Sequence, residues 1–135
     1  MNIAVSPKMT VPDFITGLSE EERNFIAELD YGNDANRHRE ELDRVIESGG
    51  RVDHENQGWY PYEVIELGKN WLQEGHEREF VACAGIVLQN ICDESDICNE
   101  WEINMSVLRS VWDRLLPSHK ELLEPLTLEA QKLGS

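Results

Sequence analysis

Two acidic segments contain the residues of this chain whose types and spacing suggest a site. Residues 52–68 include no Lys or Arg and combine carboxylates with three large aromatic side chains. The predicted contact residues here are Asp53, Glu55, Trp59, Tyr60, Tyr62 and Glu63. Trp and Tyr are enriched at binding hot spots because they bury a large area while keeping a polar group. The chemistry they indicate is protein recognition.

The second segment, residues 93–102, has five acids and no base. Its predicted contact residues are Asp93, Glu94, Asp96 and Glu100. The alternative is that these acids form a solvated loop and helix start, in which Glu100 and Glu102 complement a helix dipole. The aromatic side chains of the first segment likewise have a structural alternative, because aromatic residues dominate cores as well as interfaces.

Metal and catalytic patterns are weak in this chain. The three Cys and four His lack paired ligands at zinc-site spacing, since Cys92 and Cys98 have no second close pair. Each histidine is therefore expected to be a surface or capping residue. Cys83 lies in an apolar run, where a thiol is inert. With no nucleophile elbow or phosphate-binding glycine loop, we predict no catalytic residue, no metal and no cofactor.

The net charge is the clearest guide to the partner. The chain has 12 Lys+Arg and 27 Asp+Glu, a formal net charge of −15. The balance is 5 − 11 = −6 for residues 1–50, 3 − 12 = −9 for residues 51–102, and 4 − 4 = 0 for residues 103–135. Such a field repels nucleic acid and anionic lipid and speeds encounter with a basic protein. We therefore expect a basic protein partner, no nucleic acid and no membrane.

Composition predicts that the chain folds. Of its 135 residues, 40% are hydrophobic, which separates it from acidic disordered chains. We expect one domain over residues 1–135, with residues 1–10 extended or flexible. The longest apolar run, residues 80–88, is too short for a membrane span. The first residues do not form a signal peptide, and the odd number of cysteines suits a reducing compartment, so a cytoplasmic location is expected.

Helix start and stop signals divide the first part of the chain. Ser19 before three glutamates predicts a helix that ends near Gly32, and Asn33-Asp34 predicts the next, which ends at Gly49-Gly50. Pro61 opens a third helix through Trp71 and Leu72, which Gly75 separates from a fourth. The fourth contains residues 80–88 and should be the buried central helix, because it is apolar on all sides.

The remaining chain continues the helical pattern. Residues 93–96 are predicted to be a loop, followed by a fifth amphipathic helix from Trp101 to Leu115. Pro117 starts a sixth segment, in which Pro125 should force a kink or restart. No alternating strand of convincing length is present. The sequence thus predicts an all-α bundle of five or six helices. Its core is expected to bury Phe80, Ala84, Val87, Leu88 and Ile91 against Leu67, Trp71, Leu108 and Trp112.

A recognisable combination of sequence features occurs in the segment from Trp59 to Leu67, in residues 79–84 and in the helix with Trp101 and Trp112. Over residues 35 to 117 it resembles the small acidic helical immunity proteins of bacterial polymorphic or contact-dependent toxin systems. The resemblance implies a bacterial cytoplasmic protein that binds a cognate toxin, often a basic nuclease, and masks its active site. It carries over no binding residue by position.

Three hypotheses for function follow. The first is a protein-binding module, most specifically an immunity-type inhibitor that occludes a basic toxin. The second is an enzyme with an unrecognised carboxylate site, which a carboxylate cluster in a deep pocket would favour. The third is a helical assembly or regulatory module, which would expose an apolar patch and self-associate. The partner and the oligomeric state stay open at this point.

Overall fold

The fold is built in layers around one helix. The computed structural model describes residues 9–31, 35–50, 65, 68–94 and 99–133, and no strand occurs among them. Six α-helices and two short 3-10 helices follow in chain order: α1 (Val11–Thr16), α2 (Glu20–Tyr31), α3 (Ala35–Glu47), η2 (Lys69–Leu72), α5 (Glu77–Glu94), α6 (Asn99–Val111), η3 (Trp112–Arg114) and α7 (Pro117–Leu133). The predicted all-α bundle is confirmed.

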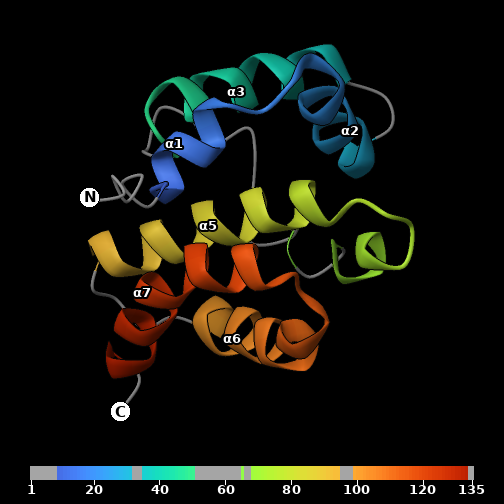
Figure 1. Cartoon of the computed structure of the whole chain (residues 1–135). Coiled ribbons are helices and arrows are strands. Elements are labelled where there is room, and N and C mark those ends of the chain that lie inside the picture. Colours follow the sequence, from blue (N-terminus) through green and yellow to red (C-terminus); the bar gives the residue numbers. More distant parts are fainter. Residues whose placement is uncertain (1–8, 32–34, 51–64, 66–67, 95–98, 134–135) are drawn as a thin grey trace, which may run out of the picture.

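Helix α5 is the middle layer. Figure 1 shows α1, α2 and α3 on one side of it and α6 and α7 on the other. Every side chain from residue 80 to residue 88 is at most 1% exposed, so this stretch is covered on all sides. The predicted central helix is therefore confirmed, and so is the burial of Phe80, Ala84, Val87, Leu88 and Ile91.

The residues that were expected to pack against α5 are buried to different degrees. Trp71 and Leu108 are buried as predicted, but Trp112 is only half-buried, because it lies in η3 where the chain leaves α6. Leu67 lies outside the described residues. The described end of the predicted third helix is the 3-10 helix η2, which contains Trp71 and Leu72.

Two close approaches fix the upper layer on α5. A Cβ atom on Gly85 would lie 2.6 Å from Cγ1 of Val11, so only glycine lets α1 pack at this distance. At the other end, the side-chain amides of Gln89 and Asn90 donate to the carbonyl oxygens of Gly49 and Gly50, at 2.9 and 3.0 Å. These bonds hold the turn after α3 against α5.

The predicted helix boundaries agree well with the structure. At the start of α2, the Ser19 hydroxyl accepts from the Glu22 N–H at 3.1 Å, and the Glu22 carboxylate accepts from the Ser19 N–H at 2.8 Å. This reciprocal pair is a capping box. Gly49 and Gly50 follow α3 with φ of 77° and 96°, a region that glycine occupies at little cost.

Of the predicted kink or restart at Pro125, the restart does not occur, because α7 runs through the proline as a single helix. Pro125 is exposed, so the carbonyl that loses its intrahelical donor lies on the solvent side. Leu123, Thr127 and Ala130 are buried on either side of it, and the Thr127 hydroxyl donates to the Leu123 carbonyl at 2.8 Å. Packing on α5 outweighs the local cost of the proline.

Two further boundaries differ from the prediction. The first two residues of the expected loop at 93–96 belong to α5, which extends to Glu94. Helix α1 was not predicted, since it has only six residues and includes Pro12. Thr10 caps it by accepting from the Asp13 N–H at 3.3 Å, and Val11, Phe14 and Ile15 bury its inner face.

Replacing Leu88 tests the core. Leu88 is 1% exposed in the middle of α5, so Leu88→Ala should lower the free energy of unfolding by about 2–5 kcal/mol through lost burial and a residual cavity. The matched control is Leu128→Ala, since Leu128 is 50% exposed and should change stability little. Urea unfolding followed by circular dichroism measures both. Equal stability of the two variants would show that α5 is not the core.

Candidate functional site

The contact residues predicted from sequence fall mainly outside the described structure. Those that lie outside the described residues are Asp53, Glu55, Trp59, Tyr60, Tyr62, Glu63 and Asp96. The backbone of three others is described: Asp93 and Glu94 end α5, and Glu100 lies in the first turn of α6. The acidic surface that the structure does describe is on α2 and α3.

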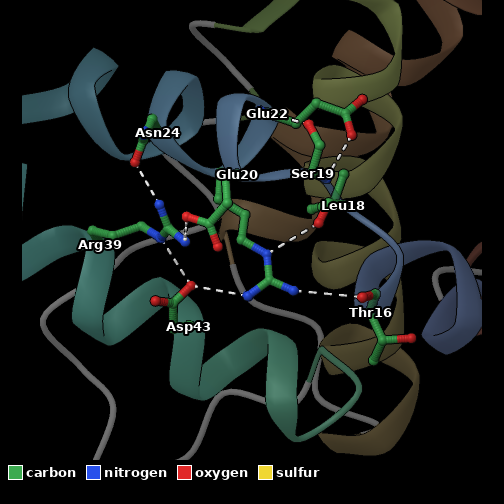
Figure 2. A network of polar contacts seen from close by, with 9 residues as sticks. Thr16, Leu18, Ser19, Glu20, Glu22, Asn24, Arg39 and Asp43 are labelled. Atoms are coloured by element: carbon green, nitrogen blue, oxygen red, sulfur yellow. Dashed lines mark hydrogen bonds and ion pairs between the residues drawn. The ribbon is translucent and has the colours of Figure 1, made fainter.

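An arginine network joins α2 to α3 (Figure 2). Arg23 donates to the Asp43 carboxylate at 3.2 Å and to the carbonyl oxygens of Leu18 and Thr16 at 3.2 and 3.4 Å. Arg39 donates to the same Asp43 oxygen at 2.9 Å, to Glu20 at 2.7 Å and to Asn24. Each guanidinium therefore makes three bonds inside the protein.

The acids of this network hold Arg39 in its ionised state. Partial burial of Arg39 by itself would lower its pKa, but the hydrogen bonds and charges of Asp43 and Glu20 raise the pKa above its usual value. Arg23 also closes the turn between α1 and α2, because two of its acceptors are the carbonyl oxygens of Thr16 and Leu18. The role of both arginines is structural.

The other described bases near this layer are also paired. Arg44 lies 3.5 Å from Glu41, and the Arg78 Nε of α5 donates to the Glu22 carboxylate at 2.6 Å. Exposed acids are left over: Glu21 and Glu28 on α2, and Glu40 and Glu47 on α3. No described base forms an ion pair with any of these four.

These four residues form what we call the acidic rows. Within each helix the two glutamates are seven residues apart, which places them on the same face of the helix. That face is the solvent side, because the buried residues Ile26 and Ala27 of α2 and Leu42, Val45 and Ile46 of α3 lie opposite. The arrangement presents unneutralised carboxylates to an approaching molecule and can do so without rearranging the fold.

The histidines with described side chains differ from the expectation of simple surface residues. His119 is only 7% exposed, and its Nδ1 lies 2.5 Å from Oε2 of Glu77, which also accepts from the Leu116 N–H at 2.7 Å. His76 is half-buried, with Nδ1 2.7 Å from Glu79 and its ring stacked on Phe25. Glu77 thus joins the start of α5 to the start of α7, across 42 residues of sequence.

His119 also borders a cleft between α1, α5 and α7. The cleft has a volume of about 370 Å³. It is lined by Met9, Phe14, Arg78, Ser118, His119, Glu121 and Leu122. Sequence reasoning missed this cleft because its residues come from three distant segments, and no local spacing connects them.

The described residues include no group of three or more His, Cys, Asp or Glu placed to hold a metal ion. No helix among them is long and apolar enough to cross a membrane. Comparison with protein-family models, with curated proteins and with solved structures gave no match to this chain. Its function has to be argued from the surface itself.

The ion pair between Glu22 and Arg78 should make stability depend on pH. Burial by itself would raise the pKa of Glu22, but the hydrogen bonds from Arg78 and Ser19 and the charge of Arg78 lower it below its usual value. The unfolded chain therefore takes up the proton first as pH falls. The contribution of Glu22 is complete above the unfolded pKa of about 4.3 and is lost as pH falls through the lower folded value.

Glu22→Gln tests this linkage. The variant should be less stable than the wild type at about pH 7, and the difference should shrink as pH falls through the lowered folded pKa of Glu22. Urea midpoints across this range measure it. Glu21→Gln is the control, because Glu21 is exposed and forms no described ion pair. A difference between wild type and Glu22→Gln that is constant with pH would contradict the prediction.

Proposed function

We propose that this protein is an interaction module that binds a basic protein, most specifically an immunity-type inhibitor that occludes a basic toxin in the bacterial cytoplasm. The observation that carries the proposal is the distribution of charge around α2 and α3. Their arginines with described side chains are paired inside the protein, whereas the acidic rows are exposed and form no ion pair with a described base. The field of the chain, formally −15, therefore acts outward.

The mechanism is electrostatic capture followed by steric occlusion. Unpaired carboxylates on a preformed helical surface speed encounter with a basic partner and repel nucleic acid. A partner that is itself a nuclease has a basic active-site surface for the same reason that its substrate is anionic. An acidic protein that covers this surface blocks the substrate by charge and by volume.

Two regions are assigned to this contact. The acidic rows of α2 and α3 supply the long-range attraction, together with the acids at residues 53–63 and 93–100. Trp59, Tyr60 and Tyr62 supply large side chains that become desolvated on binding and slow release. The resemblance of residues 35–117 to immunity proteins supports the class of partner, a cognate toxin, and carries no contact residue.

Charge reversal of the acidic rows is the direct test. The variant Glu21→Lys, Glu28→Lys, Glu40→Lys and Glu47→Lys changes the net charge by eight, from −15 to about −7. Exposed charges contribute little to stability, so the fold should persist. The probe is the basic protein recovered with this chain by pulldown, with rates measured by surface plasmon resonance. The association rate constant should fall about tenfold or more at low salt.

A charge-matched variant separates position from net charge. Glu102→Lys, Asp113→Lys, Glu124→Lys and Glu129→Lys reverse four exposed acids on α6, η3 and α7 and give the same net charge. This control should associate faster than the variant of the acidic rows. Equal rates for wild type and the variant of the acidic rows would show that the rows are only solvated. The absence of any basic protein encoded nearby would remove the toxin assignment.

Trp59→Ala tests the aromatic contact. The substitution removes buried area without changing charge, so it should raise the dissociation rate constant and leave the association rate constant nearly unchanged. The wild-type association rate should instead fall steeply between about 50 and about 500 mM NaCl. The same surface plasmon resonance experiment measures the association and dissociation rate constants. Leu128→Ala is the exposed apolar control outside the proposed contact. An unchanged dissociation rate would exclude Trp59 from the interface.

A further inference from the structure

The cleft between α1, α5 and α7 has the size and composition of a small-molecule site. Its volume of about 370 Å³ lies within the usual range of ligand pockets. Phe14 and Leu122 give it apolar walls, and the exposed Met9 lies at its edge. Arg78, Ser118 and His119 add hydrogen-bonding groups to the same space.

Arg78 has donors to spare in this cleft. Its Nε donates to Glu22 at 2.6 Å, and its guanidinium carbon lies 4.8 Å from the centre of the Phe14 ring. Among the described residues, no other acceptor bonds to it, and neither terminal NH₂ group has a partner there. A guanidinium that is stacked and held at one nitrogen presents a planar fork, which matches a carboxylate.

His119 is the second independent feature. It is 7% exposed, Glu77 holds its Nδ1, and its ring meets the Phe14 ring edge-on at 5.8 Å. His119 lines the cleft, and its Nε2 makes no hydrogen bond to a described residue. This atom accepts a hydrogen bond when the ring is neutral and donates when it is protonated.

The start of α7 contributes to the same place. Ser118 is the second residue of this 17-residue helix, and no described residue accepts from its backbone N–H. Free N–H groups at a helix start favour a negative group. Arg78 and His119 both contact the Phe14 ring, and Ser118 precedes His119 in sequence, so three polar residues of the cleft lie near one aromatic side chain.

We propose that this cleft binds a small organic acid. Its carboxylate lies between the Arg78 fork, the start of α7 and His119 Nε2, and its apolar body lies against Phe14, Leu122 and Met9. Glu121 is the one acid that lines the cleft; it is exposed, so water and salt weaken its repulsion. An inorganic anion would leave the apolar walls unused, and a neutral apolar molecule would leave the Arg78 fork unused.

The test uses benzoate as the probe, with inorganic phosphate and benzyl alcohol as matched comparisons. Benzoate should shift the imidazole resonances of His119 saturably, with a dissociation constant on the order of 1–10 mM, as expected for so small a molecule. Phosphate and benzyl alcohol, each with half of the required chemistry, should bind at least about tenfold more weakly. Absence of saturation up to about 50 mM benzoate would overturn the proposal.

Variants locate the site. Arg78→Lys keeps the positive charge beside Glu22 but loses the planar fork, so benzoate affinity should fall about tenfold. Arg109→Lys, on α6 and outside the cleft, is the control and should bind benzoate like the wild type. Thermal melting verifies that each variant folds. If Arg78→Lys does not fold, the comparison of benzoate with benzyl alcohol on the wild type decides, and equal affinity for the two overturns the carboxylate role.

Discussion

Complete burial of α5 is the constraint on which the rest of the structure depends. A helix that is apolar on all sides cannot lie on a core; it has to be enclosed by one. Because α5 is the middle layer, α1 to α3 must cover one side and α6 and α7 the other. Each of these helices is amphipathic and has only one face to bury, so their outer faces are free to carry the charge of the molecule.

That division explains why so acidic a chain can fold. Repulsion among 27 carboxylates favours expansion, and the protein offsets it by placing its few arginines where one cation meets several acceptors. Asp43 accepts from both Arg23 and Arg39, and Glu22 combines a helix cap with the ion pair to Arg78. Because these ion pairs use these arginines, no described base pairs with the acidic rows. The same ion pairs therefore contribute both to stability and to the surface charge.

Sequence could predict the elements whose signals are local. Ser19, Gly49 and Pro117 mark real helix boundaries, and the apolar run at 80–88 is the real centre. The errors came where packing over long range decided the outcome. Pro125 is tolerated because Leu123 and Thr127 are buried beside it, and the six residues of α1 hold their place through Val11 and the absent side chain of Gly85.

The two candidate sites also differ in whether the sequence alone could predict them. The excess of acids is a property of composition, so the expected preference for a basic partner could be stated from sequence. The bond between Glu77 and His119 joins residues 42 apart, and the stacking of Arg78 on Phe14 joins α5 to α1. Neither leaves a local pattern, because both depend on how helices that are separate in sequence meet on the central helix.

The ion pair of Glu22 and Arg78 connects the helix α2 to the cleft, and its geometry argues that the two proposed sites act independently. Glu22 lies in the first turn of the acidic helix α2 and takes only the Nε of Arg78. A carboxylate in the cleft would use the end-on fork formed by the two terminal nitrogens, whose outer N–H groups point away from the Nε–H bond in the planar guanidinium. A ligand therefore has no need to displace Glu22. Since coupling between sites requires a ligand to favour one arrangement over another, occupation of the cleft should leave the acidic rows as they are.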